Sequence, residues 1–243
     1  MTPHRPYLGP PRRLLVAALF AALLCGLGSP SAGAAEGAKA VDPDEARAEL
    51  ARRGVNFNPI AFFAAVAQDE AEVVTLFLQA GMDPATLDGT NKTALWVAVE
   101  EGRLGSLRAL LAAGVRPTGA NAPSEGLGKS IVFAAVDTGN VEFVRALLEA
   151  GADAKAVNDY GVAPLDEAAR VGQIEMCKLL LAAGANPNNA ASGYPMLYGP
   201  INENQVEAVR LLLDAGAKLG GQKVELLEAA KSPEMRALLE AAE

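Results

Sequence analysis

The chain has 243 residues, of which 51% are hydrophobic, and it carries 29 acidic and 21 basic residues for a net charge of −8. A chain of this length and apolar content can bury a sizeable core. Its negative charge disfavours nucleic acid and anionic lipid as partners, because both would repel it.

The first 35 residues are predicted to be a secretory signal peptide. Their arginines precede the apolar run 14–24, and no acidic residue occurs among them. The small residues 32–34 read Ala-Gly-Ala, which fits the A-x-A rule and predicts cleavage after Ala34 or the next residue. Residues 36–43 then form a linker, and the expected location is the bacterial periplasm.

Other readings of this leader stay open. The segment is short for a membrane span, but a retained leader would anchor the protein in the inner membrane. Cys25 is the alternative site for a lipoprotein anchor, although the large Leu24 precedes it. The pair at positions 12–13 invites a twin-arginine signal, although its flanking residues fit poorly.

Removal of residues 1–35 leaves little reactive chemistry. The leader holds three basic and no acidic residues, so the remaining chain has 18 basic and 29 acidic residues, a net charge of −11. The one histidine and one of the two cysteines leave with it. Catalytic Ser-His or Cys-His pairs and His/Cys zinc clusters are thereby excluded. The remaining Cys177 is predicted to be a buried thiol on an apolar helix face.

Two further patterns resemble reactive sites without the required context. Residues 126–130 end like a phosphate-binding loop, but position 123 is proline where that motif needs its first glycine. Glu100, Glu101 and Asp137 are the most concentrated carboxylates, and adjacent helical carboxylates usually form a solvated face. We therefore predict no enzymatic activity, no cofactor and no metal site.

One phrase recurs through the rest of the chain and decides the architecture. Its successive final glycines are 33, 37, 33 and 32 residues apart, and a period near 33 is typical of a stacked solenoid. The five copies of this Leu-Leu-x-Ala-Gly-like phrase are at residues 77–81, 110–114, 147–151, 180–184 and 212–216.

Residues 158–184 show what one repeat contains. Pro164 stands where a first helical turn tolerates a missing donor, and a short helix is predicted over 165–170. A second helix is predicted over 174–183, where apolar residues recur at helical spacing. Gly184 then ends this helix. Neither helix is long enough to be stable alone, so each must pack against neighbouring copies.

These residues resemble the ankyrin repeat. The start of the family consensus is matched by residues 93–96 (Thr-Ala-Leu-Trp) and 163–166 (Ala-Pro-Leu-Asp), and its finish by residues 150–153 and 183–188. The resemblance runs from about Asp44 to the C-terminus, and no position carries the histidine of the family. It implies an all-α ankyrin-type solenoid of stacked helix-turn-helix repeats with short hairpin-like turns.

The repeats divide the chain into three further parts. Residues 44–57 are predicted to be an N-terminal part-repeat that caps the array with a charged face. Five repeats follow over residues 58–217, and a C-terminal helix pair over residues 218–243 closes the stack. The helices expected in the two caps cover residues 44–53, 222–230 and 233–242.

The resemblance implies that a partner binds the concave surface, built from turn tips and the exposed ends of the first helices. This surface is acidic in the middle, while Tyr160 and Tyr194 lie toward its C-terminal part. These tyrosines either anchor a partner or pack along their own turns. The residues expected to bind the partner are Thr90, Lys92, Trp96, Glu100, Glu101, Lys129, Asp137, Asp159, Tyr160, Arg170, Tyr194, Asn202 and Glu203.

A second row stands where the family has its histidine. It consists of Phe63, Trp96, Phe133, Asp166 and Tyr198. The four aromatic residues either line the groove as a stripe or, as is more usual, fill the space between repeats. The aspartate is expected to cap a local backbone group.

Two irregularities interrupt the pattern. The stretch 115–129 is four residues longer than its counterparts and is rich in proline, glycine and serine. Residues 193–200 contain two prolines and the glycine at position 199, so the first helix of the fifth copy is expected to be short or distorted.

These features predict a non-catalytic protein–protein interaction module, a scaffold or adaptor in the bacterial envelope that binds through its concave surface. The alternative is an inhibitor or immunity-type protein that occludes a target enzyme. Its acidity favours a partner with a basic surface, unless the charge serves only solubility. No nucleic acid, no direct membrane contact of the mature domain, and a monomeric state are expected.

Overall fold

The computed structural model describes residues 42–117, 130–191 and 194–242. The predicted signal peptide, the cysteine at position 25 and most of the long stretch 115–129 lie outside the described residues, as does Lys129. Within the linker predicted over 36–43, Asp42 and Pro43 are described, and they begin the first helix.

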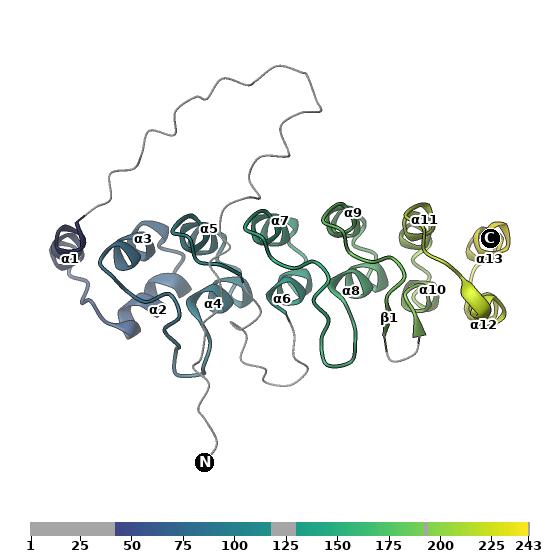
Figure 1. The fold of residues 1–243 in the computed structure, drawn as a ribbon, viewed down its shortest axis with the longest axis horizontal. Coiled ribbons are helices and arrows are strands. Elements are labelled where there is room, and N and C mark those ends of the chain that lie inside the picture. The colour runs from purple at the N-terminus through teal and green to yellow at the C-terminus, as the bar shows by residue number, and fades with distance from the viewer. Residues whose placement is uncertain (1–41, 118–129, 192–193, 243) are drawn as a thin grey trace, which may run out of the picture. The chain divides into compact units, whose positions relative to one another are not determined.

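The described residues form a single α-helix followed by six helix pairs (Figure 1). The single helix is α1 (Pro43–Arg52). The pairs are α2 (Pro59–Ala67) with α3 (Ala71–Gln79), α4 (Ala94–Glu100) with α5 (Leu104–Ala112), α6 (Ile131–Asp137) with α7 (Val141–Glu149), α8 (Pro164–Arg170) with α9 (Ile174–Ala182), α10 (Tyr198–Asn202) with α11 (Val206–Asp214), and α12 (Lys223–Ala229) with α13 (Pro233–Ala241).

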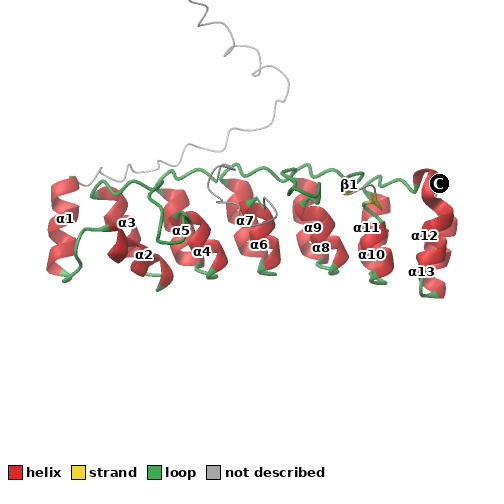
Figure 2. Ribbon diagram, turned by 90° about the horizontal axis from the view of Figure 1, so that it is seen from below, coloured by secondary structure: helices red, strands yellow, loops and turns green. Residues whose placement is uncertain are grey.

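The helices lie in two rows. The first helices α2, α4, α6, α8, α10 and α12 pack one against the next, and the second helices from α1 to α13 do the same (Figure 1). Figure 2 shows the long connections between pairs along one end of the helices and the short turns within pairs at the other end. The all-α solenoid predicted from the repeat is therefore confirmed.

Short polar caps and prolines start many of these helices. The Asn58 side chain accepts a hydrogen bond from the backbone of Ala61 at 2.9 Å, and Thr93 caps α4 in the same way. Proline occupies the first helical position of α1, α2, α8 and α13, where its missing N–H is not needed. Each cap satisfies a donor that a helix of five to ten residues would otherwise leave free.

The core runs between the two rows through every copy. In the first-helix row it contains Leu95 and Leu165, and in the second-helix row Leu110, Leu147 and Leu180, all with no exposed surface. Because equivalent leucines from neighbouring copies join one apolar cluster, each short helix is stabilised by the copies beside it.

The fifth copy departs from the others. Its loop forms a two-stranded antiparallel hairpin, β1 (Ala190–Ala191) with β2 (Tyr194–Pro195), and a 3₁₀ helix, η2 (Gly220–Gln222), leads into the last pair. Its first helix, α10, has only five residues, which confirms that the first helix of the fifth copy is short. In the described part of the chain no helix has the length and hydropathy to cross a membrane.

Candidate functional site

The expected partner-binding residues occupy two places in each copy. Thr90 and Lys92 belong to the loop that precedes α4, whereas Glu100 is the last residue of α4 and Glu101 its C-cap. These places are at opposite ends of the first helix (Figure 2). The candidate site is therefore a strip that runs along each first helix from its loop to its turn.

The loop of the second copy is closed by Asp88. Its Oδ1 accepts hydrogen bonds from the backbone N–H groups of Thr90 and Lys92, both at 2.8 Å. Burial raises the pKa of Asp88, but hydrogen bonds from Lys92 and Thr90 outweigh it and the net pKa is lowered. Asn91 adopts a left-handed backbone with φ of 61°. The loop is thus preorganised by its own polar side chain.

Asn158 holds the loop of the fourth copy with the same geometry. Its Oδ1 accepts from the backbone of Tyr160 and of Val162, each at 3.0 Å. Asp159 and Tyr160 are exposed on this loop, and 56% of the tyrosine is accessible to solvent. The two loops therefore present their tip residues on equivalent rigid turns.

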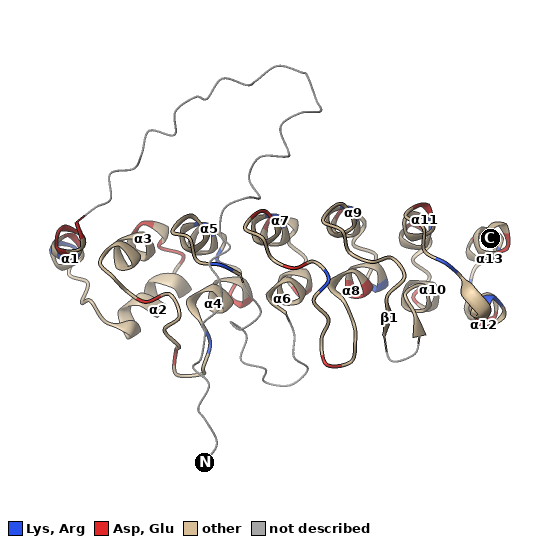
Figure 3. Cartoon of the chain, viewed as in Figure 1, with Lys and Arg blue, Asp and Glu red and all other residues tan. Residues whose placement is uncertain are grey.

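Basic side chains neutralise part of the acidic middle of this strip. Lys92 Nζ lies 2.6 Å from Glu100 Oε2, and Arg103 lies 3.6 Å from Glu101. Lys and Arg are interspersed with Asp and Glu along both helix rows (Figure 3). The strip is consequently less acidic than its carboxylates alone suggest.

Arg170 lies in the field of carboxylates from three successive copies. Both its Nε and its Nη2 bond Glu167, at 3.0 and 2.5 Å, and this pairing raises the pKa of Arg170. The charges of Glu203 and Asp137, from the following and the preceding copy, raise it further. Arg170, Glu203 and Asp137, three of the expected site residues, therefore interact electrostatically at the turn end of the first helices. Asn202, next to Glu203 in the sequence, is half-buried.

Four aromatic side chains occupy the position of the family's histidine. Phe133 is 4% exposed, and Phe63 and Trp96 are partly buried against the core. Tyr198 differs, because 37% of it is exposed. Filling of the space between repeats is therefore right for Phe63, Trp96 and Phe133, and wrong for Tyr198.

Asp166, the fourth residue of that row, caps the start of its own helix as expected. Its Oδ2 accepts a hydrogen bond from the backbone of Ala163 at 2.6 Å. Asn189, which the sequence did not single out, donates to the same oxygen at 2.6 Å and to the carbonyl of Gly161 at 2.8 Å. Burial raises the pKa of Asp166, although both hydrogen bonds oppose it. These contacts join the fourth copy to the loop of the fifth.

A hollow of about 300 Å³ opens between the fourth and fifth copies. The rings of Tyr194 and Tyr198 lie 4.8 Å apart at its edge, with an angle of 34° between their planes. Arg170 and Glu167 line its other side. The ring of Tyr194 thus contacts a ring of α10, and 56% of Tyr194 stays exposed.

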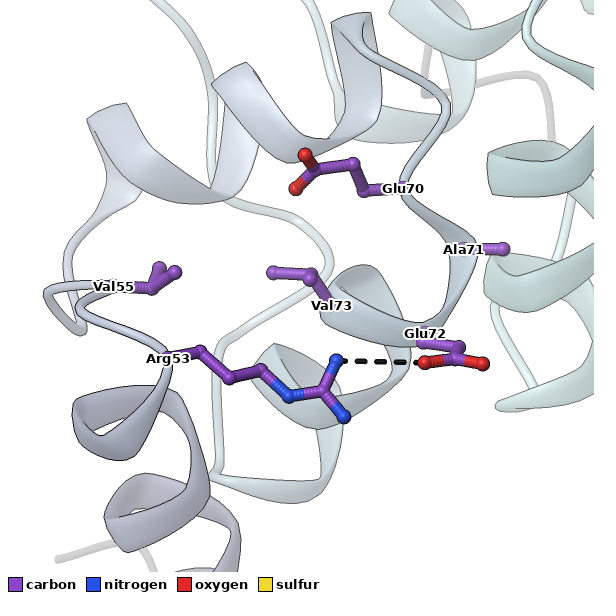
Figure 4. A pocket seen from close by; sticks show the side chains of 6 residues that line it. All are labelled: Arg53, Val55, Glu70, Ala71, Glu72 and Val73. Carbon is purple, nitrogen blue, oxygen red and sulfur yellow. Dashed lines mark hydrogen bonds and ion pairs between the residues drawn. The ribbon is translucent and has the colours of Figure 1, made fainter.

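A second hollow lies at the N-terminal end, where the first-helix row begins only at α2. Two adjoining cavities of about 470 and 420 Å³ share Val55, Glu70 and Val73 as lining residues. Arg53 and Glu72 form an ion pair across the larger cavity at 3.4 Å (Figure 4). These side chains show no nucleophile beside a base.

The one cysteine among the described residues is buried. Cys177 has no exposed surface, and burial raises the pKa of its thiol to about 12. A thiol in this state is not a nucleophile at neutral pH. No group of histidine, cysteine, aspartate or glutamate that could hold a metal ion occurs within the ranges that the structure describes.

A single stack of short helix pairs, with ordered loops at one end and an exposed polar strip, defines a helical-repeat solenoid. The model of the family "Ankyrin repeats (3 copies)" matches residues 115–191 and 133–223. The chain is an ankyrin repeat protein, and ankyrin repeats in general are a non-catalytic fold that mediates protein–protein interaction.

Known proteins resemble the chain over most of its length. An ankyrin repeat-containing protein of Treponema pallidum (strain Nichols) is 31% identical over 173 residues, 71% of this chain and 46% of the relative. The chain thus spans less than half of that relative. The crystal structure of the Bcl-3 ankyrin repeat domain, described as a unique member of the IkappaB protein family, has a TM-score of 0.65, 29% identity, and coverage of 82% of this chain and 93% of that one. An ankyrin repeat domain from Acinetobacter baumannii AYE has a TM-score of 0.67, 28% identity, and coverage of 75% and 97%.

Proposed function

We propose that the chain is a scaffold or adaptor in the bacterial envelope that holds a partner protein against the strip along its first helices. The observation that carries this proposal is the repetition of exposed polar and aromatic side chains on rigid loops and helix ends in successive copies. Rigid presentation lowers the entropy lost on binding, which is how a repeat scaffold gains affinity.

Charge reversal on the strip tests this proposal. The full-length protein is compared in a cross-linking capture experiment with a Glu100→Lys, Glu101→Lys, Tyr160→Ala variant. Reversal at Glu100 and Glu101 leaves Lys92 and Arg103 without their carboxylates, so a basic partner should be repelled. One stoichiometric partner, lost with this variant, is the expected result.

A matched variant on the second helices separates the strip from a general charge effect. Glu175 and Glu207 are exposed in the first turns of α9 and α11, so Glu175→Lys with Glu207→Lys changes the net charge by the same amount. The partner should stay bound to this control. Loss with both variants, or with neither, would contradict the proposed strip. An assay of the captured partner, alone and in complex, then distinguishes an adaptor from an inhibitor that occludes it.

The envelope location is part of the proposal and rests on the sequence of residues 1–35. Periplasmic recovery of a chain that lacks 34 or 35 N-terminal residues, measured by intact mass, is the expected outcome. A chain that keeps these residues in the membrane fraction would point to the anchored form, and a lipid-modified Cys25 to the lipoprotein.

A further inference from the structure

The hollow between the fourth and fifth copies exposes an aromatic pair that packing does not require. Tyr198 occupies the repeat position at which Phe133 is buried, yet 37% of it is exposed. The ring of Tyr194, on the hairpin, packs against it at an angle of 34°, and 56% of Tyr194 is exposed. Two adjoining exposed rings at the edge of a cavity offer a π surface to a ligand.

Gly199 lines this hollow next to Arg170. A Cβ atom at this position would lie 3.4 Å from Cγ of Arg170, so the arginine stem lies across the glycine. The guanidinium of Arg170 is held by Glu167 with two hydrogen bonds. The one cation among the residues that line the cavity is thus tied to one side and leaves the tyrosine rings uncovered.

The charge around the rings is negative. Asp166 and Glu167 line the hollow, and Asp137 and Glu203 lie close enough to Arg170 for their charges to act on it. Three carboxylates, those of Glu167, Glu203 and Asp137, therefore act on one guanidinium. A cation that stacks on an aromatic face within reach of carboxylates gains from both interactions.

We propose that this hollow binds an arginine side chain of the partner protein, stacked on Tyr194 and Tyr198 and attracted by the carboxylates around Arg170. The proposal rests on the proposed function and names the anchor that this face would accept. Arginine fits better than lysine because its planar guanidinium stacks on a ring and is more weakly hydrated. Arginine and tyrosine are also the side chains that most often carry the binding energy of an interface.

Short peptides test the hollow apart from any natural partner. The full-length protein with ¹³C-labelled tyrosine is titrated with acetyl-Gly-Arg-Leu-Gly-amide, with the same peptide carrying lysine, and with the same peptide carrying citrulline. Citrulline has the shape of arginine without its charge. The arginine peptide should shift the ring signals of Tyr194 and Tyr198 with saturation, and should bind about ten-fold more tightly than the citrulline peptide.

Two variants should change this affinity in opposite directions. Tyr194→Leu removes one ring from an exposed position, so the arginine peptide should bind about ten-fold more weakly. Arg170→Gln removes the competing cation and frees Glu167, so binding should become several-fold tighter. Equal binding of the arginine and citrulline peptides, weaker binding to the Arg170 variant, or no saturation up to about 10 mM would overturn the proposal.

The two proposals can fail separately. Capture of a partner that is sensitive to Glu100→Lys but insensitive to Tyr194→Leu would leave the protein-binding function in place and refute the arginine anchor. Selective binding of the arginine peptide without any captured protein would support the anchor and count against the adaptor.

Discussion

Gly172 lies in close contact with a residue of the following copy. Its φ of 75° is a left-handed conformation that side chains rarely adopt, and a Cβ atom there would overlap Oε1 of Gln205 in the following copy. Gly102 occupies the same repeat position with φ of 69°, and no atom of a neighbour lies within 4 Å of its added Cβ.

Alanine substitutions at Gly102 and Gly172 distinguish the energetic cost of backbone strain from the cost of the contact between copies. Gly102→Ala should cost about 1 kcal/mol of unfolding free energy through φ alone. Gly172→Ala should cost about 1 kcal/mol more, because the Gln205 side chain must move as well. Urea unfolding of the two variants checks the difference, and equal losses would show that Gln205 yields freely.

The buried Cys177 thiol predicts a dependence of stability on alkaline pH. Its pKa of about 12 in the folded protein exceeds the value of about 8.5 expected in an unfolded chain. Because the folded pKa is the higher one, the thiol's contribution to stability is complete below pH 8.5 and is lost as pH rises from there toward 12. Wild type should lose about 1.4 kcal/mol more than Cys177→Val between pH 7 and pH 9.5, measured by urea unfolding. Parallel losses in both proteins would mean that the thiol ionises in the folded state.

The burial and hydrogen bonding of single residues could be predicted from the sequence where these depend on one repeat alone. Cys177 on an apolar helix face and Asp166 as a cap both follow from local spacing. Contacts between distant positions were missed, because a repeat pattern does not say how far a side chain reaches. The repeat pattern predicted neither the ion pair of Lys92 with Glu100 nor the packing of the Tyr194 ring against Tyr198.

Within the element, a cap can come from the preceding copy. The helix α5 has no cap from its own N-terminal residue, and the carboxylate of Asp69 instead accepts from the backbone of Ser106 at 2.6 Å and of Gly105 at 3.3 Å. The absence of a side chain at Gly105 makes room, since a Cβ there would lie 3.1 Å from Asp69 Oδ1. Asp69 itself has φ of 58°, where most copies carry glycine.

Replacement of Asp69 by glycine measures how much this cap contributes to the free energy of unfolding. Asp69→Gly relieves the strain of the left-handed backbone but removes the two hydrogen bonds of the carboxylate. Asn204→Gly relieves the same strain at the equivalent position, where φ is 55°. The side-chain amide of Asn204 makes no hydrogen bond to another described residue. The difference between the two variants in unfolding free energy should be about 1 kcal/mol in favour of the cap. Identical urea midpoint shifts would show that solvent replaces the carboxylate without loss.

Helix boundaries were predictable because the period repeats them. The helix expected over 174–183 is α9, Ile174–Ala182, and the one expected over 44–53 is α1, Pro43–Arg52. The hairpin of the fifth copy was not located, because its two-residue strands carry no alternating pattern. The hollow beside the hairpin depends on the same backbone, so it could not be predicted from the sequence either.

At the scale of the whole array, stability should vary along the stack because each copy contacts only its neighbours. The helices α4 and α6 bury four and five residues each, whereas α10 buries two and α12 only Leu226. The C-terminal pairs therefore have fewer buried contacts to lose when they open, and local opening costs less free energy where burial is low.

Hydrogen exchange should consequently be at least about ten-fold faster in α10 to α13 than in α4 to α9, since a gap of 1.4 kcal/mol already gives that factor. Gly199→Ala in α10 should slow exchange in the C-terminal pairs, because alanine favours the helix by about 0.5–1 kcal/mol and its Cβ makes an ordinary contact with Arg170. Exchange in α4 to α7 should stay unchanged, because these helices make no contact with the substituted residue, whereas α8 contacts it through Arg170. Uniform protection along the array would instead require that the copies unfold as one unit, so that the shortest helix no longer sets the first opening.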